Sequence, residues 1–328
     1  MFDSEDVQKI EKLVGCKIPD DVLQEASNEE SVLWREIDGE QFGFVSAEDH
    51  AGVQRFANDE KRSPLAKIPE LKIFWMDGES NFIGIFVSGP MVGRLALIGH
   101  DTNVDCAPLY RNLNSFVASM AAGPEAPESE WHYQVDYINT GDEMRVGASN
   151  AEIEDDIECI EQIKRLLDST DEPIRKRFLN SCVISLTPKE NAAELLPLTE
   201  SPDHHVCGRA CAMLGYYQFD EASRKLAEIA VDAKNPARFM AIDGLGLMKT
   251  EIAKFCLIEM VRSGKPLSGN VTSALSKHGF EPYATKSRSD TGQLIINWQV
   301  QLSVEKGPEL INMDWAPRPG CWWIHMTW

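Results

Sequence analysis

The chain has 328 residues, more than one ordinary domain usually contains, so two or more folded units are expected. It carries 52 acidic and 32 basic residues, which gives a formal net charge of -20 and a sequence pI of about 4.8. This charge disfavours nucleic acids and anionic membranes as partners, because both are themselves negatively charged. The apolar fraction of 43% and the eight tryptophans are sufficient for folded cores, so the acidity does not indicate a disordered chain.

No targeting or membrane segment is expected. The first residues, MFDSEDVQKIEK, are acidic and lack the basic region and apolar run of a secretory signal. The best membrane candidate, residues 82–93, is interrupted by Gly89-Pro90 and is well short of the roughly 20 residues that a spanning helix needs. The eight cysteines are scattered without CxxC pairs, which favours reduced thiols. We therefore expect a soluble cytoplasmic protein.

The negative charge is concentrated in the first half of the chain. Residues 1–123 hold 21 acidic and 11 basic residues, residues 124–161 hold 12 and 1, and residues 162–328 hold 19 and 20. The middle segment begins near GPEAPESE and ends with AEIEDDIECIE, a composition typical of a solvated connector. We predict an acidic N-terminal domain (1–123), an acidic linker (124–156) and a nearly neutral remainder.

The N-terminal domain is predicted to mix helices and strands. Apolar residues recur at helical spacing up to Gly15, which favours a first amphipathic helix that ends there. Pro19 followed by two aspartates predicts the start of a second helix, Ser46 begins a third, and residues 114–121 form a fourth. Strand-like runs occupy residues 32–37, 42–45, 71–76, 82–87 and 92–98. This order predicts an α+β fold with helices on a mostly antiparallel sheet.

Four segments of this domain follow a known family pattern. They are the helix IEKLVG, the helix start IPDDV, the run FWMDGESNFIGIFVSGPMVGRLALIGHD and the closing helix NSFVASMA. Residues 10–121 thereby resemble the SUKH superfamily, which includes a fungal regulator of cell-wall assembly and bacterial immunity proteins that neutralise polymorphic toxins. Glu79 and Ser80 stand where the family has glycines, and VLQEASNEESVLW replaces its long aromatic helix. The resemblance implies a partner-binding cleft on the sheet that carries residues 75–81.

The second half of the chain contains an internal repeat. The segment VCGRACAMLG (206–215) aligns with ARFMAIDGLG (237–246), 31 residues later, and Ile174 lies 32 residues before Val206. Each unit opens with an acidic or proline turn and continues into a second helix, such as residues 221–231. The period predicts pairs of helices in which small residues allow close approach.

This pattern resembles HEAT repeats of the short bacterial type. Arg175 and Arg238 occupy the usual arginine position, whereas Cys207 replaces it in the middle unit. The resemblance implies a short α-solenoid of HEAT-like helical pairs over residues 157–280, in which stacking covers the apolar face that one unit alone would expose.

Three further segments alternate apolar and polar residues, as strands with one exposed face do: residues 131–137, 296–304 and 322–328. Five of the eight tryptophans lie beyond residue 290. The pattern predicts a β-hairpin within the linker and a Trp-rich C-terminal segment of strands, residues 281–328. Our hypothesis is a small accessory β-sheet in which the C-terminal strands pair with residues 131–147.

No catalytic, cofactor-binding or metal site is predicted. Cys207 and Cys211 lie near two histidines, but both occupy apolar repeat positions, which favours core packing over zinc binding. Gly244-Leu245-Gly246 lies inside a helix and not between a strand and a helix, so it does not indicate a phosphate loop. His100-Asp101 lacks an accompanying nucleophile motif and is better explained as a turn.

The composition and the two resemblances favour a non-enzymatic protein-binding module. The resemblance implies a bacterial immunity protein that neutralises a polymorphic toxin, or a related regulatory scaffold. The acidic run 152–161 is typical of a solvated face, and its field would attract a cationic partner such as a basic toxin. The candidate partner-binding residues are Trp75, Asp77, Glu79, Asn81, His100, Asp101, Glu221, Arg224, Lys225 and Glu228.

Two other functions remain open. Some short HEAT-like repeats resemble those of phycobilin lyases, which implies an enzyme-assisting module that holds a tetrapyrrole and is coloured when purified. A general recruiting scaffold would instead use the exposed helix residues of the repeats.

Overall fold

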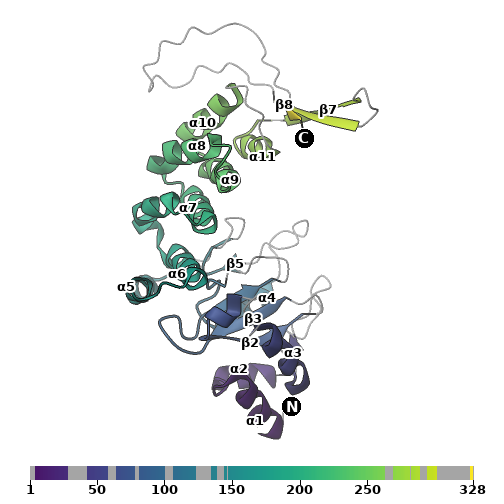
Figure 1. Ribbon diagram of the computed structural model, residues 1–328, viewed down its shortest axis with the longest axis vertical. Coiled ribbons are helices and arrows are strands. Elements are labelled where there is room, and N and C mark those ends of the chain that lie inside the picture. Colours follow the sequence, from purple (N-terminus) through teal and green to yellow (C-terminus); the bar gives the residue numbers. More distant parts are fainter. Residues whose placement is uncertain are drawn as a thin grey trace. The chain divides into compact units, whose positions relative to one another are not determined.

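The computed structural model of the chain divides into two compact units, Met1–Asn191 (unit 1) and Ala192–Trp328 (unit 2). The structure describes residues 4–28, 43–57, 64–77, 81–99, 106–122, 134–138, 144–145, 147–262, 269–280, 282–288, 294–300 and 326–327. An N-terminal antiparallel sheet with helices is followed by a largely helical C-terminal region of packed helices (Figure 1). The expected mixed class is confirmed at this level.

The sheet of unit 1 has four strands in the order β1 (Gly43–Phe44), β2 (Leu71–Met76), β3 (Phe82–Phe86) and β4 (Leu95–Ile98). Each neighbouring pair is antiparallel. All five residues of β3 are buried, so both faces of the sheet are covered at its centre. β4 begins later than the predicted 92–98, because Gly93 has a positive φ of 84° in the turn before it. The predicted strand 32–37 lies outside the described residues.

The helices of the N-terminal part are α1 (Ser4–Val14), α2 (Asp20–Ala26), α3 (Ala47–Ala57) and α4 (Leu113–Ala122), with the short 3₁₀ helix η2 (Pro64–Lys67). α1 ends as predicted at Gly15, which has a φ of 74°. α3 begins as predicted, because the Ser46 hydroxyl accepts a hydrogen bond from the Asp49 backbone N–H at 3.1 Å.

Two further helices, α5 (Asn150–Ser169) and α6 (Pro173–Leu186), share a hydrophobic core with the sheet. In Figure 1, the sheet lies between α1 and α2 on one side and α5 and α6 on the other. The Phe86 ring of β3 stacks on the Phe178 ring of α6 at a centroid distance of 6.0 Å. The charge pattern assigned residues 150–156 to a linker, which is wrong: a capping box at Ser149 and Glu152 begins α5 there.

Up to β7 (Pro282–Arg288), the described residues of unit 2 form helices without an intervening strand. The long 3₁₀ segment η3 (Lys189–Glu200) leads into α7 (His204–Tyr216), η4 (Asp220–Ala222), α8 (Ser223–Val231), α9 (Arg238–Met248), α10 (Glu251–Arg262) and α11 (Gly269–Lys277). Small residues allow backbones to meet: a Cβ on Gly215 would lie 2.3 Å from the Gly244 carbonyl oxygen, and one on Gly246 would lie 2.8 Å from the Ala274 Cα. The backbones of α7 and α9, and those of α9 and α11, therefore lie in close contact.

The remaining strands differ from the predicted arrangement. β5 (Gln134–Val135) pairs with β6 (Met144–Arg145) in parallel, so these residues do not form the expected hairpin. The backbone N–H groups of Asp136 and Tyr137 instead donate to the Leu109 carbonyl, which ties the chain after β5 to the segment before α4.

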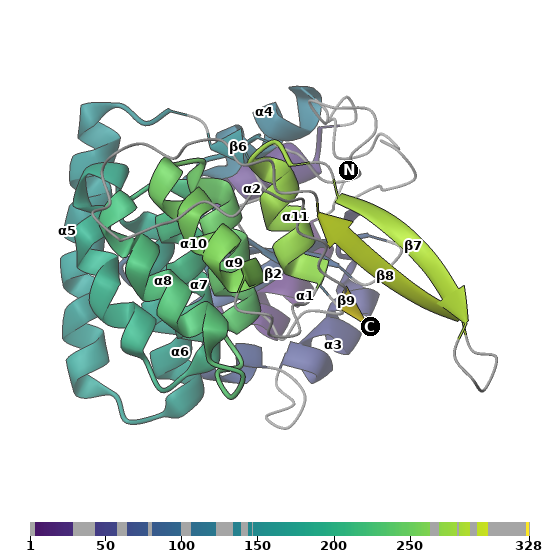
Figure 2. The ribbon, with the colours of Figure 1, turned by 90° about the horizontal axis from the view of Figure 1, so that it is seen from above.

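The C-terminal strands pair with one another. β8 (Leu294–Val300) lies between β7 (Pro282–Arg288) and β9 (Met326–Thr327) in an antiparallel sheet, and β7 and β8 form the ribbon seen in Figure 2. Most residues of the hypothesised pairing with residues 131–147 lie outside the described residues, so that pairing remains a hypothesis. An antiparallel partner next along the chain satisfies the β8 backbone at a lower loop-closure cost than a distant one.

Candidate functional site

A buried ionic network attaches α5 to the rest of unit 1. Arg94, at the start of β4, donates from Nε to the Tyr137 hydroxyl at 3.1 Å. Its Nη2 contacts Asp155 at 2.5 Å and Asp156 at 3.2 Å. Arg111, before α4, donates to Tyr137 at 2.9 Å and to Asp156 at 2.7 Å. The Tyr137 hydroxyl in turn donates to Asp156 at 2.5 Å.

Burial governs the electrostatics of this network. Asp156 is 1% exposed. Burial raises the pKa of the Asp156 carboxyl, while the hydrogen bond from Tyr137 and the charges of Arg111 and Arg94 oppose that rise. Burial also raises the pKa of Tyr137, so its phenol remains protonated and able to donate. Such a network is costly to open, because each removed partner leaves a buried charge uncompensated.

The outer face of α5 presents acidic side chains to solvent. Its exposed carboxylates are Glu152, Glu154, Asp155, Glu158, Glu161 and Asp168. Ile157, which is 37% exposed, lies among them. Among the acidic residues of the run 152–161, which was predicted to be a solvated face, only Asp156 is buried. Unit 1 as a whole contains 37 acidic and 18 basic residues, whereas unit 2 contains 15 and 14. The negative field therefore belongs to unit 1.

The predicted residues near the β2–β3 turn have structural roles. Trp75 is 1% exposed and packs edge-on against Phe44 at 5.8 Å, so its ring does not offer a surface to a partner. The buried carboxylate of Asp77 accepts hydrogen bonds from the Asn81 backbone N–H at 2.7 Å and from its side-chain Nδ2 at 2.6 Å. These bonds close the turn between β2 and β3. Glu79, His100 and Asp101 lie outside the described residues.

The predicted residues of unit 2 lie on η4 and α8. Glu221, Arg224 and Glu228 are exposed. Lys225 is half-buried, with its Nζ 2.8 Å from the Glu200 carboxylate. This ion pair ties α8 to η3, and the three exposed side chains remain accessible to a partner.

The cysteine and glycine motifs of the repeat lie in the packed interior. Cys207 and Cys211 are buried, and the Cys207 thiol donates to the Thr199 carbonyl at 3.1 Å. Within the described part of the chain, no group of His, Cys, Asp and Glu is arranged to hold a metal ion. Gly244 and Gly246 lie inside α9 against neighbouring helices, as their helical position predicts.

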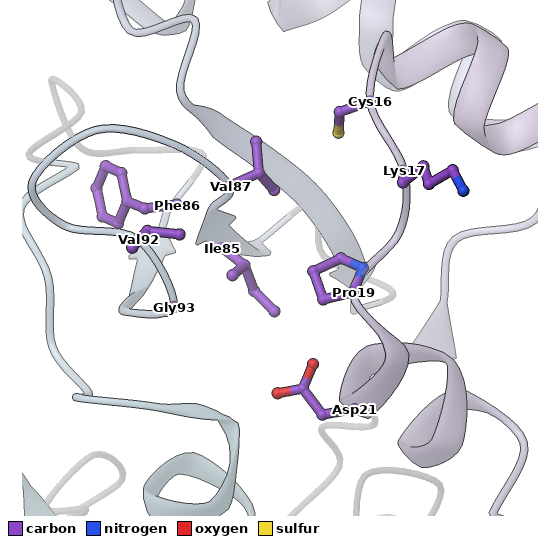
Figure 3. Close-up of a pocket in the computed structure, with 9 residues that line it drawn as sticks. All are labelled: Cys16, Lys17, Pro19, Asp21, Ile85, Phe86, Val87, Val92 and Gly93. Carbon is purple, nitrogen blue, oxygen red and sulfur yellow. The ribbon is translucent and has the colours of Figure 1, made fainter.

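A pocket of about 340 Å³ lies between the α1–α2 connection and the end of β3 (Figure 3). Its lining residues are Cys16, Lys17, Pro19, Asp21, Ile85, Phe86, Val87, Val92 and Gly93. In Figure 3, the Asp21 carboxylate points toward the space beside Ile85 and Pro19, whereas the Lys17 ammonium extends away from it. Val92, on the rim, is 58% exposed. The pocket thus combines apolar walls with one inward carboxylate.

The sequence did not identify the network or the pocket. Arg94 interrupts an apolar run, which signals a buried arginine in need of an acidic partner, but 62 residues separate it from Asp156. The pocket joins two segments that are about as far apart in the sequence. No short sequence motif indicates that Arg94 contacts Asp156, or that the two pocket segments lie together.

Comparisons with protein-family models, with curated proteins and with solved structures found no match for this chain. None of the described helices is long and apolar enough to cross a membrane.

Proposed function

We propose that the chain is a non-enzymatic protein-binding module whose acidic unit 1 binds a basic protein, such as a polymorphic toxin that it neutralises. Residues 10–121 would be a SUKH-like domain, and the helices that follow would be short HEAT-like repeats. The order of elements in residues 4–122 supports the first assignment: two helices, a short strand, a third helix, three antiparallel strands and a closing helix.

The contacts between glycines support the second assignment. Gly215 and Gly246 are 31 residues apart, as the repeat predicts, and they lie against the backbones of Gly244 and Ala274 respectively. Helical repeats that stack in this way provide extended surfaces for other proteins.

The acidic outer face of α5 is the single observation that carries the proposed function. Its carboxylates are exposed on a helix whose inner side is fixed by Arg94 and Arg111 through Asp156. Glu152, Asp155 and Glu161 pair with Arg111, Arg94 and Lys164, and Arg165 is also exposed on α5. The helix still carries a surplus of exposed carboxylates, and such a surplus attracts a basic surface and speeds its encounter. An immunity protein could cover the basic substrate groove of a toxin in this way.

The test is capture of partners from a lysate of the producing organism on the immobilised chain, followed by mass spectrometry. We expect a stoichiometric protein of high pI that is retained by the wild type and lost from the double variant Glu154→Lys/Glu158→Lys. The matched control is Glu221→Lys/Glu228→Lys, which changes the net charge equally on the exposed residues of unit 2. Recovery of no stoichiometric protein would overturn the proposal, and loss only from the control variant would assign binding to the repeats.

A further inference from the structure

The pocket beside α2 suggests what kind of side chain a partner would insert. Apolar atoms of Pro19, Ile85, Val87 and Val92 line it, and the backbone N–H groups of Val87 and Gly93 already donate to carbonyls of unit 1. The walls thus offer a ligand contact with hydrocarbon. A volume of about 340 Å³ is at the lower end of pockets that hold small ligands, enough for one long side chain.

The pocket lining contains one carboxylate, Asp21, and one ammonium group, Lys17, and the two point in different directions. The Asp21 Oδ1 accepts a hydrogen bond from the Val22 backbone N–H at 3.0 Å. The carboxylate is exposed and points toward the pocket, while Lys17 extends outward (Figure 3). A ligand with an apolar stem and a cationic end would place the stem against Ile85 and Val92 and the end at Asp21. Lysine and arginine side chains have this form.

The pocket is joined to helix α5 through the β3–β4 turn. Val92 and Gly93 line the pocket, and the next residue, Arg94, contacts Asp155 and Asp156. On the same turn, the Pro90 carbonyl accepts a hydrogen bond from the Cys159 thiol of α5 at 3.2 Å. The same turn therefore borders the pocket and contacts the inner side of α5.

We propose that this pocket receives a lysine or arginine side chain of the basic protein partner, with Asp21 as its counter-charge. The inference rests on the proposed function and adds to it a defined anchor point. Anchor side chains that enter a pocket contribute much of the affinity of protein interfaces, whereas exposed charge pairs contribute mainly to encounter.

The test uses NMR titration of the full-length chain with three capped amino acids at pH 7. N-acetyl-lysine methylamide and N-acetyl-arginine methylamide carry the cationic side chain, and N-acetyl-norleucine methylamide carries only an apolar one. We expect saturable shifts of the amides of Cys16, Lys17, Val87, Val92 and Gly93 with the cationic probes. Asp21→Asn should weaken their binding at least about fivefold, because a charge-assisted hydrogen bond is lost.

Asp20→Asn is the matched control. Asp20 is exposed, lies in the same first turn of α2 and does not line the pocket, so its neutralisation should leave probe affinity within about twofold. The inference would be overturned if the cationic probes gave no saturable shifts, or if the norleucine probe bound as tightly as they do. It would also be overturned if Asp20→Asn weakened probe binding as much as Asp21→Asn. The probe experiment needs no partner, so its failure leaves the proposed function intact. Saturable probe binding combined with failed partner capture would overturn only the proposed function.

Discussion

Asp156 fixes α5 because its buried carboxylate accepts hydrogen bonds from Tyr137, Arg94 and Arg111. Asp156→Asn removes the negative charge and leaves two buried arginines facing an amide. We expect the variant to lose about 3–5 kcal/mol of unfolding free energy, the usual cost of breaking a buried pair. Urea denaturation followed by far-UV circular dichroism measures this loss.

Asp155→Asn is the control for that prediction. Asp155 contacts the same Arg94, but its side chain is 70% exposed, so its loss should cost less than about 1 kcal/mol. Equal destabilisation by the two variants would show that the network does not depend on the buried carboxylate.

His50 makes unit 1 sensitive to acid. Its ring is buried against Phe74, and both ring nitrogens lack a hydrogen-bond partner among the described residues. Burial lowers the pKa of His50 from 6.5 to about 4, with a smaller opposing effect of Asp49. Because the folded-state pKa is the lower one, the neutral ring stabilises the fold fully above pH 6.5, and this stability is lost as the pH falls toward 4.

The predicted loss from His50 between pH 7 and pH 5 is about 2 kcal/mol. His50→Leu removes the titrating group. Between pH 7 and pH 5, the variant should therefore lose about 2 kcal/mol less unfolding free energy than the wild type loses. Urea unfolding at the two pH values measures the difference. Parallel losses in the two proteins would contradict the assigned role of His50.

At the scale of elements, the contact of α7 with α9 depends on Gly215. A Cβ there would lie 2.3 Å from the Gly244 carbonyl oxygen, so the two backbones must separate in Gly215→Ala. We expect the variant to lose about 1–3 kcal/mol of stability, the usual cost of overpacking, despite the higher helix propensity of alanine. Thermal unfolding followed by circular dichroism reports the change.

Gly208→Ala is the comparison for this contact. The added Cβ would lie 3.0 Å from the Met240 Cγ and 3.3 Å from its Cβ, which are side-chain and not backbone atoms, so the variant should lose less stability than Gly215→Ala. A Gly215→Ala protein that melts no earlier than Gly208→Ala would show that backbone contact does not set the spacing of these helices.

Helix ends that depend on neighbouring residues could be predicted from the sequence. The structure of segments that depend on contacts with residues far away in the sequence could not. Gly15 ends α1 and Ser46 begins α3 as expected, because a left-handed stop and a side-chain cap act within one turn. The acidic start of α5 looked like a linker, since its fixing partners Arg94 and Arg111 are far away in the sequence. The parallel pairing of β5 with β6 also depends on a distant partner. The residues after β5, Asp136 and Tyr137, donate hydrogen bonds to the Leu109 carbonyl and do not turn directly into a hairpin.

Of the candidate binding surfaces, the sequence predicted only the negative charge of unit 1. Sequence counting placed the negative charge in the first half of the chain, and α5 carries seven of the 37 acidic residues of unit 1. Trp75 and Asp77 were candidate partner-binding residues, with burial of Trp75 the alternative, and both are buried. The pocket required the fold, since it is formed where α2 meets the turn after β3.

At the scale of the whole molecule, the two units differ in how they can recognise a partner. Unit 1 carries a formal charge of -19 and unit 2 a charge of -1, so long-range attraction acts on unit 1. Binding through unit 1 should weaken as salt rises, whereas binding through unit 2 should depend on shape and local contacts.

The most direct measurement is the dissociation constant of the captured partner by isothermal titration calorimetry, for wild type and for Glu154→Lys/Glu158→Lys, at about 50 and about 300 mM NaCl. We predict that the wild type binds more weakly at the higher salt concentration and that the variant binds at least about tenfold more weakly than wild type at the lower one. Equal affinities of the two proteins, with no dependence on salt, would contradict recognition by the acidic face of α5.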